Sequence, residues 1–199
     1  AEPSSDAIRA RIAERFGIWP RDNYGLGEFY GPGVAAECEA GGCLHVLSDT
    51  FIAEVLDPES GEPTPEGELG ELVLTSLHKE ALPLLRYRTG DRTMALPQNC
   101  ACGMAHTRIG RVTGRTDTDD IMLPGGVILN RTYLENVLLP MDGAGCEYAV
   151  TVAEHPTREG LQRLYIAIEG DAESNLAQVI AHRMQVEYNC NPVVDVLPK

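Results

Sequence analysis

The stretch RYRTGD, Arg86 to Asp91, carries most of the information in this 199-residue sequence. An apolar lead-in, Leu82 to Leu85, precedes it and predicts a strand that ends at the glycine turn of Gly90. We expect the carboxylate of Asp91 to be exposed just past this strand. There it could accept hydrogen bonds from a vicinal diol such as a ribose, each worth on the order of 1.5–3 kcal/mol. A single turn of this kind could equally be a plain surface turn with a solvated aspartate.

Two further motifs accompany it. YGLGEFYGPG, Tyr24 to Gly33, lies upstream, and GRTDTDD, Gly114 to Asp120, lies downstream. An aromatic face such as that of Tyr24 suits a purine, and a carboxylate such as that of Glu28 suits a hard cation. Each motif alone could be a core tyrosine, a surface acid or a polar linker. Their occurrence together gives a functional role more weight than any one of them alone.

In this order the three motifs resemble the nucleotide-binding motifs of the adenylate-forming superfamily of acyl- and aryl-CoA ligases. The wider sequence resembles the phenylacetate-CoA ligase branch of that superfamily. The resemblance is almost continuous from Ala1 to about Gly114 and looser towards the end. It is carried by AEP at the start, YGLGEFYGPGVAAEC, CLH, GELGELVLTSLHKEALPLLRYRTGD and CACG.

The resemblance implies an ATP-dependent ligase. Such an enzyme forms an acyl-adenylate and pyrophosphate from a carboxylic acid, and CoA then displaces AMP. An aryl acid such as phenylacetate is the substrate that this branch implies. Within the motifs, Tyr24 would stack on adenine, Glu28 would help to hold Mg²⁺ and Asp91 would bind the ribose.

The remaining motif positions are assigned in the same way. Gly25 and Arg115 complete the residues that would bind ATP or AMP. The resemblance implies that Gly31, Pro32 and Gly33 lie near the acid substrate. Glycine lets the backbone approach a ligand closely, although these residues could also simply shape a turn. Arg86 and Arg88 could face phosphate or form structural ion pairs.

The third motif departs from the family pattern. GRTDTDDIMLPGGV is about two residues longer, and Gly125 stands where an arginine would be expected. One of Asp117, Asp119 and Asp120 could be the interdomain hinge, or all three could be solvated linker acids. The sequence resembles only the C-terminal portion of a ligase, without the upstream phosphate loop, and Lys199 lacks the glycine-lysine context. On its own, this chain is therefore not expected to adenylate.

Two other functions stay open. The chain could belong to a nucleotide-binding or protein-interaction module that does not catalyse. It could also belong to an adenylating enzyme that passes its acyl group to a carrier protein or an amine.

The cysteines form a second group of interest. Cys100 and Cys102 place two thiols on a tight turn, which suits one tetrahedral metal better than a strained disulfide. Cys38 and His45 are the natural further ligands, and the four predict a structural Zn²⁺ site. Cys43 or His106 could replace His45, and free buried cysteines are the alternative. We expect Cys146 and Cys190 to be core or surface thiols.

Composition excludes several partners. A net charge of −14 disfavours nucleic acids and anionic membranes. The absence of a long apolar run argues against a membrane span. Unevenly spaced cysteines without a secretory signal favour a reducing, cytoplasmic compartment. Hydrophobic content of 43% is ordinary for a globular protein, and a homodimer is one assembly open to it.

The pattern along the chain predicts an α+β fold with two domains. Residues 1–114 would be the end of the large nucleotide-binding domain, and residues 115–199 a small α+β domain that is incomplete at its end. In the first part we expect a helix over 5–16, capped by Ser4 or Ser5, and a hairpin of strands within 51–63 and 67–77.

The small domain should contain a helix, two strands, a helix and a strand, with the helices on one face of a sheet. The first helix begins after Asn130, the strands span 146–155 and 161–170, and the last strand spans 191–198. The side chains expected to point inward are Leu134, Val137 and Leu138 on the first helix, and Leu176, Val179, Ile180 and Met184 on the second, which spans 173–188.

Overall fold

The computed structural model of the chain describes residues 4–115, 120–123, 127–154, 156–157 and 162–198. These residues form two compact units. The first consists of Phe16–Asp119 with Ala1–Ser4, and the second of Ser5–Arg15 with Asp120–Lys199. The predicted boundary at 114/115 concerns the domains of a parent enzyme and stays a prediction.

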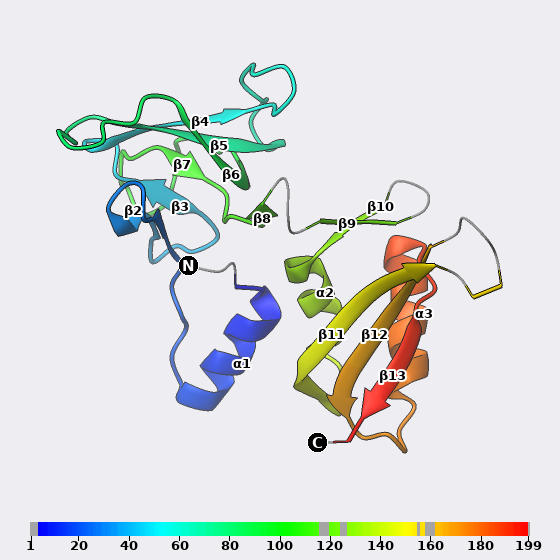
Figure 1. The fold of residues 1–199 in the computed structure, drawn as a ribbon. Coiled ribbons are helices and arrows are strands. Elements are labelled where there is room, and N and C mark those ends of the chain that lie inside the picture. The colour runs from blue at the N-terminus through cyan, green and yellow to red at the C-terminus, as the bar shows by residue number, and fades with distance from the viewer. Residues whose placement is uncertain (1–3, 116–119, 124–126, 155, 158–161, 199) are drawn as a thin grey trace. The chain divides into compact units, whose positions relative to one another are not determined.

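The first unit consists of two four-stranded sheets (Figure 1). One has the order β1-β2-β3-β7, formed by Asn23–Leu26, Gly31–Glu37, Leu44–Val46 and Arg108–Ile109. The other has the order β4-β5-β6-β8, formed by Phe51–Leu56, Leu69–Ser76, Tyr87–Met94 and Gly114–Arg115. Antiparallel pairing of β4 with β5 confirms the predicted hairpin.

Apolar side chains from both sheets form the core of this unit. Phe29 packs edge-on against Phe51 and Tyr87, with ring centroids 5.6 and 5.8 Å apart. Leu72 and Leu74 on β5 are fully buried in the same cluster. Val73 between them is also buried, so both faces of β5 are covered. This strand therefore shows no alternation between buried apolar and exposed polar residues.

Among its described residues, the second unit contains three helices, two before its three-stranded sheet and one between the last two strands of that sheet. Its elements are α1 (Asp6–Phe16), β9 (Asp120–Leu123), β10 (Val127–Asn130), α2 (Arg131–Leu138), β11 (Ala144–Glu154), β12 (Gln162–Gly170), α3 (Leu176–Tyr188) and β13 (Val193–Leu197). The sheet order is β11-β12-β13, antiparallel and then parallel. This arrangement confirms the predicted α+β order.

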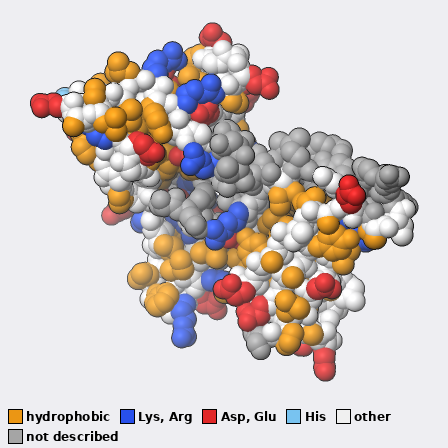
Figure 2. Space-filling model, viewed as in Figure 1, with side chains coloured by type: hydrophobic (Ala, Val, Ile, Leu, Met, Phe, Trp, Pro, Cys, Tyr) orange, Lys and Arg blue, Asp and Glu red, His pale blue; other side chains and the backbone are white. Residues whose placement is uncertain are grey.

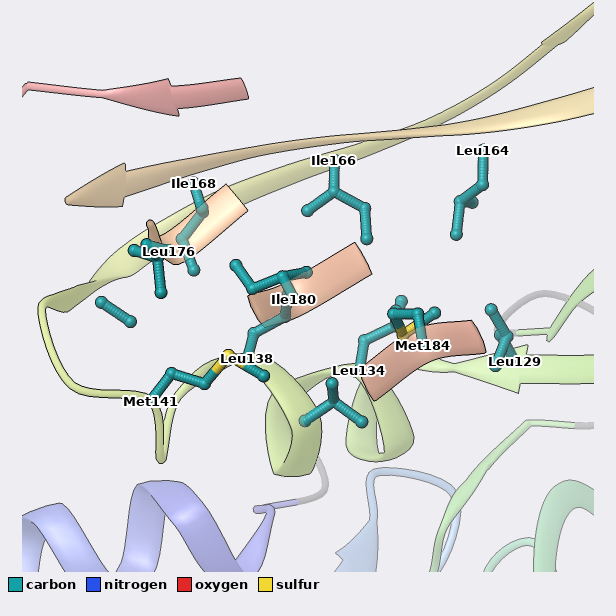
Figure 3. Close-up of a cluster of buried hydrophobic side chains, with 12 residues drawn as sticks. Leu129, Leu134, Leu138, Met141, Leu164, Ile166, Ile168, Leu176, Ile180 and Met184 are labelled. Carbon is teal, nitrogen blue, oxygen red and sulfur yellow. The ribbon is translucent and has the colours of Figure 1, made fainter. Parts of the chain in front are cut away.

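The core of the second unit lies between one sheet face and the helices α2 and α3 (Figure 3). Leu164, Ile166 and Ile168 alternate along β12 and point towards the helices. Ile180 and Met184 of α3 are completely buried against them. Leu134, Val137 and Leu138 on α2 are buried as predicted.

Val179 is the exception, because its side chain is 42% exposed. The prediction that it points inward was wrong. Consecutive helical residues point about 100° apart, and the buried positions follow the four-residue spacing Leu176, Ile180 and Met184. Val179 therefore lies at the edge of the buried stripe. α3 also begins at Leu176, because Asp171 to Ser174 form a hydrogen-bonded turn instead.

Helix α1 belongs to the second unit through Arg11. Ser5 caps the helix as predicted, since its hydroxyl accepts a hydrogen bond from the Ile8 amide at 3.3 Å. The Arg11 guanidinium donates to the backbone oxygens of Leu139, Ala144 and Gly145 at 2.8–3.1 Å. The Leu139 carbonyl, at the C-cap of α2, is thereby satisfied by a cation, as helix C-termini favour.

The surface of the first unit exposes several large apolar side chains. On the face drawn in Figure 2, hydrophobic side chains gather over the part that Figure 1 labels β4 to β6. Ile52, Leu77, Leu82 and Leu85 are exposed in this region of the sequence. Across the described ranges, no helix combines the length and the apolar character that a membrane crossing would require.

Candidate nucleotide and metal sites

The RYRTGD stretch forms a bulge inside strand β6. Val73 pairs with Arg88 and Glu71 pairs with Arg92, so that one residue of β5 faces three of β6. Gly90 takes a left-handed φ of 74°, which glycine adopts without steric cost. The expectation of an exposed Asp91 past the end of a strand was wrong. Asp91 is half-buried inside the strand, where the bulge removes it from the ladder with β5 while it still pairs with Arg115 on the other side.

Asp91 meets Tyr24 in this bulge. The Tyr24 hydroxyl donates a hydrogen bond of 2.6 Å to Oδ2 of Asp91, across 67 residues of sequence. Burial of the ring, followed by this bond to Asp91, raises the pKa of Tyr24 above its ordinary value. The hydroxyl therefore remains a donor to the carboxylate. Tyr24 is 8% exposed, and the stacking of its ring on adenine stays a prediction.

Arg115 lies beside the same bulge. Its backbone on β8 pairs with Asp91, and its guanidinium donates to the Thr89 carbonyl at 3.2 Å. A Cβ placed on Gly90 would lie 3.1 Å from the Arg115 guanidinium, which shows how closely the cation covers the turn. The structure thus brings Tyr24, Asp91 and Arg115 together, as the nucleotide hypothesis requires.

Glu28 sits on an exposed turn between β1 and β2. Its carboxylate accepts a long hydrogen bond of 3.5 Å from the Tyr87 hydroxyl. The Lys79 ammonium donates to the Phe29 carbonyl at 2.6 Å and also to the Glu28 carbonyl. This turn is therefore held in place by a cation, while the acid itself points to solvent.

The glycines of the upstream motif play two different parts. A Cβ on Gly25 would come within 1.8 Å of the Gly31 carbonyl oxygen, so Gly25 is required for close contact between β1 and β2. By contrast, a Cβ on Gly31 or Gly33 would meet nothing within 4 Å. Both have positive φ, and Pro32 between them is exposed. Gly31 to Gly33 therefore offer open backbone surface, whereas the nucleotide role of Gly25 stays a prediction.

Arg86 and Arg88 both form ion pairs. Arg86 binds Glu54 with two contacts of 3.1 Å. Arg88 binds the carboxylate of Glu71, with its Nε at 2.7 Å, and the carbonyl of Pro58 at 2.8 Å. Of the two alternatives left open by the sequence, the structural ion pair is the one observed.

The second candidate site is the group formed by Cys38, His45, Cys100 and Cys102. One ligand atom from each lies within 4.8 Å of the others. Sγ of Cys38 is 3.6 Å from Sγ of Cys100, and Nε2 of His45 is 3.5 Å from Sγ of Cys102. Ligands of a tetrahedral zinc ion lie roughly 3.5–3.8 Å apart, given Zn–S and Zn–N bonds of about 2.3 and 2.0 Å. The spacing fits one such ion.

The surroundings of the group also fit a metal. The Met104 amide donates to Sγ of Cys102 at 3.5 Å, and the Cys102 backbone amide lowers the pKa of Cys100 to about 7. Nε2 of His45 faces the thiols, whereas Nδ1 is buried without a hydrogen-bond partner among the described residues and so adds no support for a metal.

The two alternative fourth ligands lie differently. Cys43 Sγ is 3.8 Å from Nε2 of His45, on the margin of the cluster, and burial raises its pKa. His106 is engaged elsewhere, because its Nδ1 accepts from the Ser48 amide at 3.2 Å. Cys146 is exposed and Cys190 is half-buried, as surface and core thiols would be.

Sequence reasoning missed two residues that support the nucleotide region, Glu71 and Lys79. Both lie in the GELGELVLTSLHK stretch, where charged residues beside a strand look like ordinary surface positions. The signal was an acid flanked by apolar residues in Leu69–Leu74, which indicates a partnered buried charge. The hinge candidates Asp117 and Asp119, and Gly125, lie outside the described residues, as does the side chain of Asp120.

Sequence comparison finds curated phenylacetate-CoA ligases. The chain is 44% identical over 158 residues to the one from Thermus thermophilus, covering 79% of the chain and 35% of that protein. It is 39% identical over 189 residues to the one from Escherichia coli, covering 94% of the chain and 41% of that protein. The chain thus spans well under half the length of these relatives. No protein-family model matches it.

Structural comparison finds the same fold in CoA ligases. A 2-hydroxyisobutyryl-CoA ligase in the postadenylation state, in complex with R3-HIB-AMP, matches 96% of this chain and 42% of its own with a TM-score of 0.85 at 23% identity. ATP-bound MatB from Rhodopseudomonas palustris matches 99% of this chain and 40% of its own with a TM-score of 0.68 at 16% identity. These similarities establish the fold of the described residues.

Proposed function

We propose that this chain, a member of the phenylacetate-CoA ligase family, forms part of an ATP-dependent enzyme that joins a carboxylic acid to CoA. The observation that carries the proposal is the contact between Tyr24 and Asp91. It joins two sequence motifs through residues 67 positions apart, in the combination that a nucleotide site needs. Identity of 38–46% to four phenylacetate-CoA ligases supports the reaction class.

In the proposed reaction, the acid attacks the α-phosphorus of ATP to give an acyl-adenylate and pyrophosphate. The CoA thiol then attacks the acyl carbon and AMP leaves. Asp91 accepts hydrogen bonds from the ribose hydroxyls, and its orientation is fixed by the Tyr24 hydroxyl. Arg115, beside the bulge, is the nearby cation for the nucleotide. Positioning of this kind is the main contribution a protein makes to such a transfer.

The upstream turn would serve the other reactants. The exposed carboxylate of Glu28 is a suitable oxygen ligand for Mg²⁺, which neutralises phosphate charge when bound. The open backbone of Gly31 to Gly33 would lie against the acid. The names of the relatives support an aryl acid such as phenylacetate as the substrate that we propose.

The cysteine group would hold one structural Zn²⁺ through Cys38, His45, Cys100 and Cys102. All four positions would be filled by protein, which leaves no open position for catalysis. Cys38 directly follows β2, His45 lies on β3, and Cys100 and Cys102 lie between β6 and β7. The ion would therefore join segments of the first unit that are far apart in the sequence.

The decisive experiment is ATP–pyrophosphate exchange by the protein that carries this chain, tested with phenylacetate, benzoate and a short aliphatic acid. We expect exchange that depends on the aryl acid, and a CoA thioester with AMP once CoA is added. Exchange without thioester formation would favour a carrier protein or an amine as acceptor. A folded protein that binds ATP but exchanges nothing with any acid would favour the non-catalytic module instead.

A further inference from the structure

Glu71 is a buried acid beside the nucleotide region that none of the proposed steps uses. It lies on β5 and its side chain is 6% exposed. A buried carboxylate is costly unless its oxygens are hydrogen-bonded or paired. Both oxygens of Glu71 have such partners, and all of these partners belong to the RYRTGD stretch.

The two oxygens bind different parts of that stretch. Oε2 accepts from the Arg88 guanidinium, at 2.7 Å from Nε. Oε1 accepts from the backbone amide of Gly90 at 3.0 Å. Gly90 directly precedes Asp91, so this bond fixes the peptide next to the proposed ribose-binding carboxylate.

The neighbouring residue on β5 anchors the rest of the bulge. The Thr89 hydroxyl donates to the Leu72 carbonyl at 2.8 Å and accepts from the Asp91 amide at 3.0 Å. The bulge has lost regular ladder bonds over these residues. The contacts of Glu71 and Thr89 therefore replace the ladder where the backbone leaves it.

We infer that Glu71 is a positioning residue, which orients Asp91 for the ribose by holding the Gly90 amide and Arg88. The inference rests on the proposed function for its consequence, because Asp91 must bind a ribose for its orientation to matter. Arg88 is the counter-charge that makes the buried carboxylate tolerable. It does not contact the nucleotide in this scheme.

The test compares ATP with 3′-deoxy-ATP in the protein that carries this chain. Asp91 distinguishes the two by a charge-assisted hydrogen bond, so we expect the wild-type ratio of kcat/KM values to be ten-fold or more. Glu71→Ala should reduce this ratio several-fold. Glu71→Gln keeps an acceptor for the Gly90 amide and should restore most of it. A purely structural role would lower the amount of active enzyme and leave the ratio unchanged.

A matched control is available on the same sheet. Glu54→Gln removes the acid of the Arg86 ion pair, which is more exposed and does not touch the bulge. We expect this variant to keep the wild-type ratio. If Asp91→Asn abolishes discrimination while Glu71→Ala preserves it, the positioning role is refuted and the ribose assignment stands. If Asp91→Asn also preserves it, the ribose assignment itself fails, and with it the role of Glu71 in orienting a ribose ligand.

A second measurement needs no activity. Hydrogen exchange on this chain should show a protected Gly90 amide, because its acceptor is the buried Glu71 carboxylate. In Glu71→Ala, exchange should accelerate at residues 88–92 and stay unchanged in β4. An unaltered exchange rate at Gly90 would overturn the inference, whatever the enzyme assays show.

Discussion

Each of the two units is stabilised internally in a different way. The second unit has a continuous aliphatic core between two helices and a sheet, with Ile180 and Met184 completely buried. The first unit also has an apolar core, between two sheets, and no helix of its own among the described residues, but its special features are polar. A bulge is held by Glu71, and four metal-type ligands converge from distant segments. Apolar packing therefore stabilises both units, whereas polar contacts form the candidate sites of the first unit.

The largest effect is expected from loss of the proposed zinc ion, which should destabilise only the first unit. Removal of the ion by a chelator, or Cys100→Ser, should destabilise the first unit, because a structural zinc contributes on the order of 10 kcal/mol of apparent binding energy. The second unit should keep its hydrogen-exchange protection. Elemental analysis and segment-resolved exchange measure both quantities. Cys146→Ser, at an exposed thiol, is the control and should retain the metal. Purified protein with well under one equivalent of zinc would contradict the prediction.

The converse change should affect the second unit. Ile180→Ala removes a fully buried side chain and should lower the free energy of unfolding of this unit by about 2–5 kcal/mol. Val179→Ala, on the same helix at 42% exposure, should change it by about 0.5 kcal/mol or less. Unfolding in urea, monitored by hydrogen exchange in each unit, measures this free energy. Equal effects of the two substitutions would mean that the buried stripe of α3 is misassigned.

A smaller effect is expected at the nucleotide region, on activity instead of folding. Asp91→Asn keeps an acceptor for the Tyr24 hydroxyl but loses the charge. The loss should be on the order of 1.5–3 kcal/mol, or roughly ten- to a hundred-fold in kcat/KM for ATP. The thermal unfolding midpoint should barely change. A large drop in the midpoint would assign Asp91 to the structure of the first unit.

High pH should weaken the second unit through Tyr148. Burial, followed by the nearby charge of Glu135, raises the pKa of Tyr148 to about 12, whereas Arg131 acts in the opposite direction. The folded state holds the proton more tightly than the unfolded state, so this stabilisation is complete below pH 10. It should decline as the pH rises from about 10 to 12. Tyr148→Phe should flatten the profile in this window, as unfolding midpoints across it would reveal.

The smallest effect concerns a surface pair. Arg183 and Glu187 are four residues apart on α3. Nε of Arg183 lies 2.6 Å from Oε1 of Glu187, and both side chains are 39% exposed. Such pairs contribute about 0.3–0.5 kcal/mol. Glu187→Gln should therefore lower the unfolding free energy by no more than this, and less at high salt. A loss above about 1 kcal/mol would show that the polar surface of the second unit also supports its fold.

Much of the fold could be predicted from local patterns. The helix of α2 was indicated by Leu134, Val137 and Leu138 at helical spacing, and all three are buried. The β4–β5 hairpin was indicated by two apolar runs around a turn. Val179 was misplaced because periodicity defines a stripe but not its edges. Where the stripe ends is decided by the sheet that packs against it.

The candidate sites divide in the same way. The sequence predicted that Tyr24 and Asp91 belong to one nucleotide site, and the structure brings them into hydrogen-bond contact. It also predicted the four candidate zinc ligands that the structure brings within 4.8 Å of one another. It did not anticipate that Asp91 would lie inside a strand. It also gave Glu71 and Lys79 no role. The acid among apolar residues signalled only that Glu71 is buried and paired, because its bond to the Gly90 amide and the bond of Lys79 to the Phe29 carbonyl join backbone groups of distant segments, which leave no pattern along the chain.

The sequence by itself determined which chemical groups this protein has for nucleotide and metal, and the elements that carry them, because residue type and spacing are local properties. Only the tertiary structure decided how these groups are held. The bulge at Thr89 to Asp91, the buried Glu71 beneath it and the convergence of Cys38 with Cys100 all depend on strand register between distant segments. Register is set by packing on both sides of a sheet, which no short stretch of sequence specifies.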